Sequence, residues 1–324
     1  MSRELLTTGV INMTGRTGGV QEGGRRGRLS AASLAAFAVA TILLLSTATN
    51  DGARTGMRVA RQTKLVVEDV NTFTTDREGC EPITLPKDTF VPIFMLTRDR
   101  LTSFKMALES YRSSIETPYE VVVLDHQSSY PPMVAYLDEL RQNGTEVVPL
   151  LSESWREALK EARLKMKSYL KERPEVQYYV FTDPDIALPR VHPDILLFYA
   201  ALLKSCPDYN VVGPHLQISD IPEQFTGAVR GSGVVKWESQ FWTKNLPHMA
   251  TWNGAGQHFS DEDVDTTFAM RRRDVPFVRL QRPSARVHAP YAAVHTDWYF
   301  NSTDPPEDKI WYMKNLPDKK VSHW

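Results

Sequence analysis

The chain has 324 residues, of which 42% are hydrophobic and 24% are charged. This composition is ordinary for a globular protein, and it excludes a wholly disordered chain or a collagen-like fibre. Lys and Arg number 38 against 39 Asp and Glu, a net charge of -1, so no basic surplus points to nucleic acid as a partner. The two cysteines exclude a disulfide-dense scaffold and a zinc site built from four cysteines.

An uncharged apolar segment near the N-terminus is long enough to cross a bilayer. Residues 29–49 read LSAASLAAFAVATILLLSTAT, and a helix of this length spans about 30 Å. A basic cluster directly before the segment favours a cytoplasmic N-terminus: Arg25, Arg26 and Arg28. We therefore expect the signal anchor of a single-pass type II membrane protein whose remaining residues face a lumen. A cleaved signal peptide and a buried Ala-rich helix are the alternatives.

Composition divides the chain further. The first residues are rich in Gly, Arg and Thr without periodicity, and the residues after the apolar segment are polar and mixed. A regular pattern starts at Thr89. We expect five segments: a disordered cytoplasmic tail (1–28), the anchor (29–49), a stem that is poorly ordered at its start (50–88), a main domain (89–300) and a C-terminal extension (301–324).

Short apolar runs alternate with segments of helical spacing in the main domain. The ranges are 91–96, 121–124, 147–150, 176–181 and 209–212 for the predicted strands, and 101–115, 133–140, 155–170 and 195–203 for the predicted helices. This alternation predicts an α/β fold with a parallel sheet of right-handed crossover units. Ligands bind such sheets at the carboxyl ends of the strands, so the loops after the strands hold the candidate site residues. The absence of a GxGxxG or GxxxxGK[ST] loop counts against a Rossmann dehydrogenase and a P-loop kinase.

Two carboxylates follow the strand predicted at 176–181. Asp183 and Asp185 flank Pro184, which stiffens the turn. Carboxylates near a sheet interior stay ionised only when a positive charge pairs with them, and the nearest basic residue in the sequence, Arg190, lies beyond a second proline. Hard oxygen ligands suit Mg2+ or Mn2+, which usually hold substrate phosphates as well. We therefore interpret the loop as a divalent-metal site; a solvated Asp-Pro-Asp turn is the alternative.

Three strand ends together resemble a known family. The strand at 91–96 runs into TRDRL, the strand at 121–124 ends in LDHQSS, and the strand at 176–181 ends in TDPD. In this order they resemble the GT-A glycosyltransferases, close to the family-2-like branch, over roughly residues 89–300. The resemblance implies a Rossmann-like α/β/α sandwich with a mostly parallel sheet as the catalytic domain. It also implies that the Asp-x-Asp loop holds a metal ion, which bridges the diphosphate of a nucleotide sugar.

The resemblance assigns roles to residues at the strand ends. Thr97, Arg98 and Asp125 would line the nucleoside pocket, where Asp125 would accept a hydrogen bond from the base or ribose. Asp183 and Asp185 would bind the metal and the diphosphate. The loop after the second strand departs from the family pattern, because it reads HQS where Asp and Gly are usual.

Two further positions follow from the same resemblance. A histidine near the end of the core often contacts the metal or the diphosphate, and His295 matches it by order, with His288 as the rival. An acidic stretch also precedes a helix predicted at 266–271. A carboxylate is favoured at a helix N-terminus and can take the proton of an acceptor hydroxyl. The catalytic base would be Asp265 or Asp263, with Asp265 favoured; capping of an ordinary helix is the alternative.

Acidic and aromatic side chains elsewhere are candidates for the sugar or acceptor pocket, because aromatic faces stack on sugar rings: Glu238, Trp242, Trp252, Asp297 and Trp298. Trp252 begins the sequence WNGAG, which we interpret as a flexible loop. The segment 236–242 is equally consistent with aromatic core packing beneath a lid.

Two features bear on the compartment. Asn143 and Asn301 each begin an N-glycosylation sequon, which is used only on a lumenal face. A lumenal disulfide between Cys80 and Cys206 would also be compatible with the sequence. The Golgi or endoplasmic reticulum membrane is the expected location.

These patterns predict a glycosyltransferase that uses Mn2+ or Mg2+ to move a sugar from a UDP- or GDP-linked donor to a glycan or other hydroxyl acceptor. Inversion is slightly favoured over retention at the transferred carbon. A non-catalytic carbohydrate-binding or assembly protein on the same scaffold is one alternative. A sugar nucleotidyltransferase is another, although TRDRL is too short for the loop such enzymes need.

Overall fold

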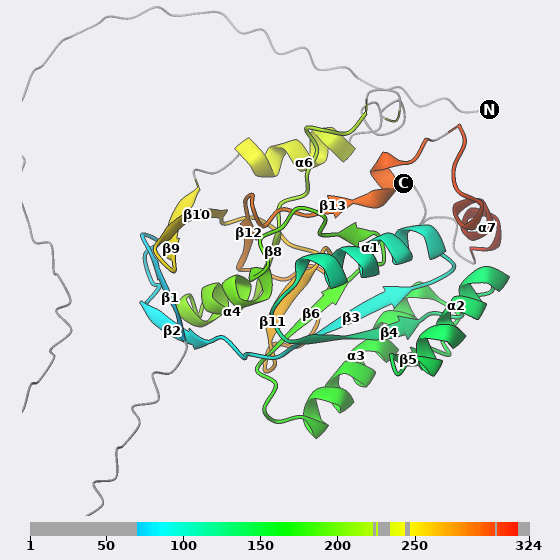
Figure 1. The fold of residues 1–324 in the computed structure, drawn as a ribbon, viewed down its shortest axis with the longest axis horizontal. Helices are drawn as coiled ribbons and strands as arrows, with labels where there is room; N and C mark the ends of the chain where they lie inside the picture. The colour runs from blue at the N-terminus through cyan, green and yellow to red at the C-terminus, as the bar shows by residue number, and fades with distance from the viewer. Residues whose placement is uncertain (1–69, 223–224, 226–233, 244–246, 302, 317–324) are drawn as a thin grey trace, which may run out of the picture. The chain divides into compact units, whose positions relative to one another are not determined.

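The computed structural model describes residues 70–222, 225, 234–243, 247–301 and 303–316 (Figure 1). The predicted cytoplasmic tail, the predicted anchor and the first part of the predicted stem lie outside these residues. Within the described ranges, no helix combines the length and the apolar character that crossing a bilayer requires.

The described residues form an 11-stranded sheet in the order β2-β1-β9-β10-β12-β8-β11-β6-β3-β4-β5 (Figure 1). Its parallel part consists of four adjacent strands: β5 (Glu146–Pro149), β4 (Tyr119–Asp125), β3 (Val91–Thr97) and β6 (Tyr178–Thr182). β3 and β6 are buried along their whole length, which explains why their sequences are unbroken apolar runs. These strands lie where the sequence predicts them.

Helices cover both faces of the sheet. One face carries α1 (Leu101–Ser114), α2 (Pro131–Gln142) and α4 (Ile195–Ser205), and the other carries α3 (Trp155–Glu172). Ile93 and Met95 of β3 belong to the first core, whereas Phe94 and Leu96 belong to the second. Alternate residues of β3 thus point to opposite helical layers, as strand geometry requires. The α/β/α arrangement predicted for a GT-A domain is confirmed.

The other part of the sheet is mostly antiparallel, and of its strands only β8 had been predicted, at 209–212. It contains β8 (Val211–Pro214) and β12 (Ser284–Val287), which are parallel to each other, and the antiparallel strands β11 (Ala269–Arg272), β10 (Ala255–Ser260), β9 (His248–Trp252), β1 (Val70–Thr75) and β2 (Ile83–Pro86). β1 pairs with β9, and Phe73 of β1 is fully buried. The sheet therefore includes residues from Val70 onward, and the boundary predicted between stem and domain at Thr89 is wrong.

The helix predicted at 266–271 does not form. Phe268 has a φ of 50°, outside the helical region, and β11 follows it directly. β11 pairs with β6 on one side and with β8 on the other, so Ala269 and Met270 are buried in the middle of the sheet. A run of six residues is too short for its apolar spacing to distinguish a helix from a buried strand.

The sequence WNGAG is a tight hairpin turn and not a flexible loop. Asn253 and Gly254 have φ values of 49° and 85° and join β9 directly to β10. A two-residue hairpin loop with a type I′ turn requires positive φ at both residues, and Asn-Gly adopts these values readily. Trp252 packs in the core, with its ring 6.4 Å from Phe73 and 5.9 Å from Phe198.

The remaining elements surround the carboxyl ends of the parallel strands. They are a two-stranded sheet of β7 (Ile186–Ala187) and β13 (Val294–His295), the 3-10 helix η2 (Thr296–Tyr299), α6 (Val234–Thr243) and α7 (Glu307–Asn315). α7 belongs to the predicted C-terminal extension, yet its Asp308 accepts hydrogen bonds from the amide and the hydroxyl of Thr102 in α1. This part of the extension is integral to the domain.

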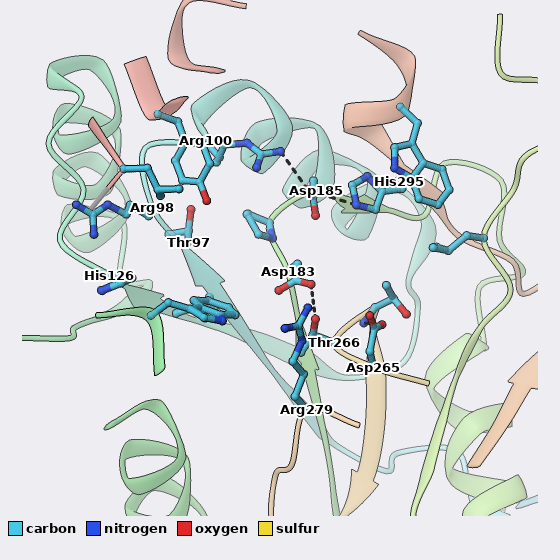
Figure 2. Close-up of a pocket in the computed structure, with 18 of the residues that line it drawn as sticks. Thr97, Arg98, Arg100, His126, Asp183, Asp185, Asp265, Thr266, Arg279 and His295 are labelled. Carbon is cyan, nitrogen blue, oxygen red and sulfur yellow. Dashed lines mark hydrogen bonds and ion pairs between the residues drawn. The ribbon is translucent and has the colours of Figure 1, made fainter. Parts of the chain in front are cut away.

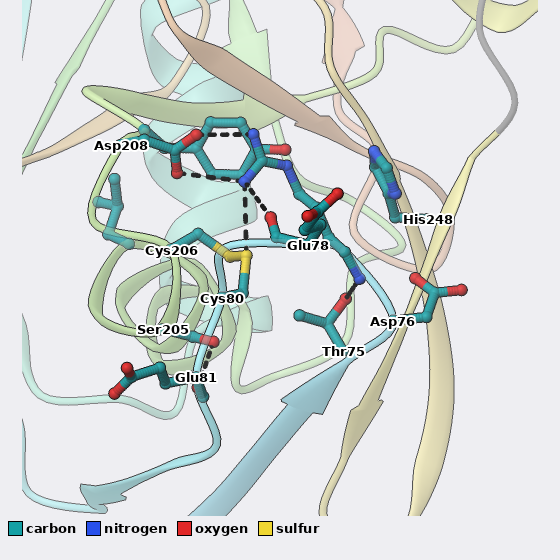
Figure 3. Close-up of a disulfide and its surroundings, with 12 residues drawn as sticks. Thr75, Asp76, Glu78, Cys80, Glu81, Ser205, Cys206, Asp208 and His248 are labelled. Atoms are coloured by element: carbon teal, nitrogen blue, oxygen red, sulfur yellow. Dashed lines mark hydrogen bonds and ion pairs between the residues drawn. A yellow bond between two sulfur atoms is a disulfide. The ribbon is translucent and has the colours of Figure 1, made fainter.

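A disulfide joins Cys80 to Cys206 (Figure 3). It connects the loop between β1 and β2 to the residue that ends α4. Arg77 lies beside it, with Nη2 2.8 Å from Asp208 Oδ2 and Nη1 3.5 Å from Cys80 Sγ. The cross-link thus fastens the antiparallel extension to a helix of the main core.

We expect loss of the disulfide to destabilise the fold. The half-cystines are 126 residues apart, and closing a loop of that size restricts the unfolded chain by about 5 kcal/mol. The double variant Cys80→Ser/Cys206→Ser should therefore lose a large part of its unfolding free energy, measured by urea denaturation. Wild-type protein with reductant should match it. An unchanged midpoint in both samples would contradict the structural role of the cross-link.

Candidate active site

A cavity of about 730 Å³ opens at the carboxyl ends of the parallel strands. The first half of the chain supplies its lining from the ends of β3, β4 and β6: Thr97, Arg98, His126, Asp183 and Asp185. The second half supplies residues from α6, from the loop before β11 and from the C-terminal elements: Glu238, Asp265, His295, Trp298 and Tyr312. Figure 2 shows Arg98 and His126 on one side of Asp183, with Asp265 and His295 on the other.

The pairing of β7 with β13 brings His295 to Asp185. His295 lies opposite Ile186 in this small sheet, and the Asp185 carbonyl accepts a hydrogen bond of 2.8 Å from the Thr296 amide. As a result, His295 Nε2 is 3.5 Å from Asp185 Oδ2. The structure therefore brings together two residues predicted to share a metal ion, although His295 comes 110 positions after Asp185 in the sequence.

Asp185 is buried, and its two carboxylate oxygens differ in their surroundings. Oδ2 accepts a hydrogen bond of 3.1 Å from Arg100 Nη2 and faces His295. Oδ1 is buried without a hydrogen-bond partner among the described residues. An unsatisfied buried carboxylate oxygen is costly, so Oδ1 is a natural position for a cationic ligand.

Asp183 shares the loop and the cavity with Asp185. Burial, with a further contribution from the Asp185 charge, raises the pKa of Asp183 from 3.8 to about 8. The Thr266 hydroxyl donates a hydrogen bond to Asp183 Oδ2, and the Asp183 amide donates one of 3.2 Å to the Thr266 carbonyl. A buried carboxylate with a second carboxylate beside it in a cleft favours a divalent cation as their shared partner.

The donor set fits a hard divalent ion only in part. No group of three or more His, Cys, Asp or Glu side chains in the described ranges could by itself hold a metal ion. The protein ligands would be Asp183 and Asp185, with His295 beside the latter. Mg2+ and related ions are commonly held by one or two carboxylates, and substrate phosphates and water complete the coordination. The unpartnered Oδ1 of Asp185 fits that arrangement.

Arg100 is a member of the site that the sequence did not reveal. Its guanidinium contacts the carboxylates of both Asp185 and Asp297. Burial alone would lower the pKa of Arg100, but the two carboxylates outweigh it and the net shift is upward. Burial alone would raise the pKa of Asp297, but Arg100 and Lys309 outweigh it and the net shift is downward. Asp297, which was predicted in the acceptor pocket, is not part of the cavity lining, and its carboxylate contacts Arg100 instead.

The side of the cavity where the nucleoside pocket was predicted has an arginine with unused hydrogen-bond donors. Arg98 Nε and Nη1, together with Thr97 Oγ1, are buried without hydrogen-bond partners in the part of the chain that the structure describes. Asp125 was predicted beside them but is not part of the cavity lining; its Oδ1 accepts a hydrogen bond of 3.1 Å from the Ser128 amide. His126 lines it instead, with Nε2 2.8 Å from the Ser152 carbonyl oxygen.

Arg279 is a second cationic residue that sequence reasoning missed. It lies between β11 and β12, its side chain is exposed at the cavity, and its charge acts on Asp183. Figure 2 shows the Arg279 side chain reaching toward Asp183 and Thr266. The only signal in the sequence was a basic residue in the loop after a buried segment, and that is too common to single it out.

The structure separates the two candidate bases. Asp265 lines the cavity, and its Oδ1 accepts a hydrogen bond of 3.2 Å from the Thr267 amide. Asp263 lies outside the cavity lining and forms an ion pair with Arg282. Neither stands at a helix N-terminus, since β11 replaces the predicted helix. Of the two acids, Asp265 alone is brought to the carboxylate pair (Figure 2).

The predicted acceptor residues divide in the same way. Glu238 lines the cavity, with Oε2 2.8 Å from Arg286 Nη1, and so does Trp298, whose ring stacks on His295 with centroids 4.4 Å apart.

Trp242 and Trp252, two further residues predicted for the acceptor or sugar pocket, are not part of the lining. Trp242 Nε1 donates to the Leu216 carbonyl at 3.1 Å, and Trp252 Nε1 donates to Asp194 at 2.6 Å. Trp252 is buried in the core, which corrects its predicted role as a pocket wall, whereas Trp242 is partly exposed and lies outside the lining.

No protein-family model matches this sequence, and no curated protein matches it. Solved structures with a similar arrangement include S. aureus TarS 1-349 (12% identity, 71% of this chain and 67% of that chain, TM-score 0.38). Another is the mannosyltransferase PcManGT from Pyrobaculum calidifontis in complex with GDP-Man and Mn2+ (20% identity, 40% and 36% coverage, TM-score 0.30). A third is glucosyl-3-phosphoglycerate synthase from Mycobacterium tuberculosis (12% identity, 57% of each chain, TM-score 0.32). This chain thus spans about a third of the mannosyltransferase. At these similarities the site is interpreted from its own geometry.

The raised pKa of Asp183 predicts a pH dependence of stability in metal-free protein. Between pH 3.8 and about 8 the folded state retains a proton that the unfolded chain has released. The contribution to the unfolding free energy is therefore present in full at the acid end and is lost as the pH rises through about 8. Denaturation in EDTA across this range should show the decline, and Asp183→Asn should reduce it. Parallel pH profiles for the two proteins would contradict the assignment.

Proposed function

We propose that this protein is a glycosyltransferase that transfers a sugar from a nucleotide-diphosphate donor to a hydroxyl acceptor with the help of Mn2+ or Mg2+. One observation carries the proposal: Asp183 and Asp185 open onto a large cavity, and the buried Oδ1 of Asp185 has no partner among the described residues. Arg98 and Arg279 line the same cavity. A diphosphate is a ligand that needs both features, because a cation and guanidinium groups bind its oxygens from different sides.

Asp183 and Asp185 would hold the ion, with His295 beside Asp185. Once bound, the ion would stabilise the negative charge that develops on the leaving diphosphate. Arg100 occupies Oδ2 of Asp185 with a hydrogen bond, which leaves Oδ1 for the ion. Thr266 orients Asp183 through its hydroxyl. The nucleoside would lie on the side of Arg98 and His126, away from Asp265 (Figure 2).

Asp265 supports an inverting reaction. Its carboxylate lies in the cavity, on the side away from the proposed nucleoside pocket (Figure 2). There it would accept the proton of the acceptor hydroxyl while the hydroxyl oxygen bonds to the anomeric carbon and the diphosphate departs with the bonding electrons. Glu238 and Trp298 line the cavity and would contact the transferred sugar or the acceptor, a glycan, glycoprotein or glycolipid.

The proposed location is the lumenal side of the Golgi or endoplasmic reticulum membrane, with residues 29–49 as a type II anchor. The Cys80–Cys206 disulfide supports an oxidising compartment. Asn143 is exposed at the end of α2, where a glycan could be attached, and Asn301 is partly exposed after η2.

Asp185→Asn should remove the response to metal. We expect the wild-type protein to show a larger thermal shift with a UDP- or GDP-linked sugar when Mn2+ is present, and the variant to lose that increment. Sugar transfer should fall by at least about a hundredfold, because the ion supplies several kcal/mol to the transition state. If the wild-type protein bound such donors but neither transferred nor hydrolysed them, a carbohydrate-binding protein would be the better description.

The two candidate bases form a matched pair of variants. Asp265→Asn should lower kcat by about 10²–10⁴-fold with little change in donor affinity, because a general base acts in the transition state. Asp263→Asn removes the same charge outside the cavity and should leave kcat near the wild-type value. Steady-state kinetics with a shared donor and acceptor would measure both. Equal effects of the two substitutions would contradict Asp265 as the base.

A further inference from the structure

The C-terminal helix α7 forms one wall of the cavity. Tyr312 of α7 and Leu316, which follows the helix, are part of the lining together with the Asp183 and Asp185 loop. These residues belong to the segment predicted as an extension beyond the catalytic domain. The helix must therefore be held there by contacts with the rest of the domain, and Tyr312 is the polar side chain that it contributes to the lining.

The first docking contact joins α7 to the start of α1. Asp308 is buried, and its carboxylate accepts a hydrogen bond of 2.9 Å from the Thr102 amide and one of 2.6 Å from the Thr102 hydroxyl. A carboxylate that accepts an amide in the first turn of a helix also interacts favourably with the helix dipole. Trp311 Nε1 adds a hydrogen bond of 3.1 Å to Ser129 Oγ, and its ring lies 5.7 Å from that of Tyr130.

The second docking contact joins α7 to the charged residues beside Asp185. Lys309 Nζ is 3.0 Å from Asp297 Oδ2, Asp297 also contacts Arg100, and Arg100 contacts Asp185. α7 is therefore connected through a line of alternating charges to the carboxylate proposed to hold the cation. These charges are largely buried, so salt in the solvent screens them little.

Tyr312 lines the same cavity as Arg98 and Arg100. Its ring centroid is 5.2 Å from the Arg100 guanidinium carbon. Burial raises the pKa of Tyr312, and the charges of Arg100, Asp185, Arg98 and Asp183 all act on it, so the phenol keeps its proton at neutral pH. Its hydroxyl makes no hydrogen bond within the described part of the chain. A protonated hydroxyl in a cavity lined by arginines is a donor suited to an anionic oxygen.

We infer that α7 completes the donor site and that the Tyr312 hydroxyl donates a hydrogen bond to a phosphate oxygen of a bound nucleoside diphosphate. This inference rests on the proposed function and names a further ligand-contacting residue for it. The two docking contacts position the hydroxyl: Asp308 fixes α7 to α1, and Lys309 fixes it to the Asp297–Arg100 pair. A neutral donor adds affinity for phosphate without adding a charge that would compete with the cation for Asp183 and Asp185.

Titration of the full chain with UDP and with GDP, each with Mn2+, tests the contact. Tyr312→Phe should weaken binding of whichever diphosphate the wild-type protein binds by about tenfold or more, the usual effect of losing a hydrogen bond to a charged group. Affinity for Mn2+ alone and the unfolding midpoint should stay unchanged. Tyr130→Phe is the matched control, because its hydroxyl lies 3.4 Å from Glu307 of α7 and outside the cavity lining. Wild-type diphosphate affinity in Tyr312→Phe would overturn the inference.

A double-mutant cycle tests whether docking of α7 positions the hydroxyl. Asp308→Ala removes a docking contact of α7 that lies outside the cavity lining, and it should weaken diphosphate binding to a similar extent. Combined with Tyr312→Phe it should add little, because both changes remove the same hydrogen bond. Fully additive losses would contradict the positioning role. A different result would contradict the proposed function: a wild-type protein that binds neither UDP nor GDP in the presence of Mn2+. That result does not depend on the behaviour of the variants.

Discussion

Arg100 neutralises two buried carboxylates, and the geometry of the candidate site depends on it. Its guanidinium occupies Oδ2 of Asp185, so that Oδ1 is the oxygen without a partner. A buried carboxylate without such a cation would take up a proton, and a protonated carboxyl is a poor ligand for a divalent ion. The same guanidinium contacts Asp297, which Lys309 of α7 also contacts. One arginine therefore connects the acidic loop after β6 with the C-terminal helix.

The sheet explains why residues from distant parts of the chain meet at this edge. β6 runs parallel to β3, so Asp183 and Arg98 both follow strand ends on the same side. β11 runs antiparallel to β6, so its beginning lies where β6 ends. The residues directly before β11 are thus brought to the acidic loop, and Thr266 bonds to Asp183 while Asp265 enters the cavity. The start of this antiparallel strand, and not the N-terminus of the predicted helix, therefore places Asp265 in the cavity.

The parts of the fold that depend on local pattern could be predicted. Continuous apolar runs identified the buried strands, and the rule that ligands bind at their carboxyl ends identified Arg98, Asp183 and Asp185. Residues whose place depends on long-range pairing could not be found: Arg279 and Tyr312 reach the cavity through β11 and α7, and no local signal marks either. Errors arose where one pattern fits two structures. The indole of Trp252, which is buried in the core, cannot be distinguished by sequence from an indole that lines a pocket, such as that of Trp298.

A crystal grown with Mn2+ and the nucleoside diphosphate that the protein binds best would test the central claim most directly. Manganese scatters anomalously, so its position can be located without reference to the shape of the density around it. The account predicts an anomalous peak within bonding distance of Asp185 Oδ1 and a carboxylate oxygen of Asp183, with diphosphate oxygens on the opposite side. A diphosphate bound in the cavity with no metal at these two carboxylates would contradict it.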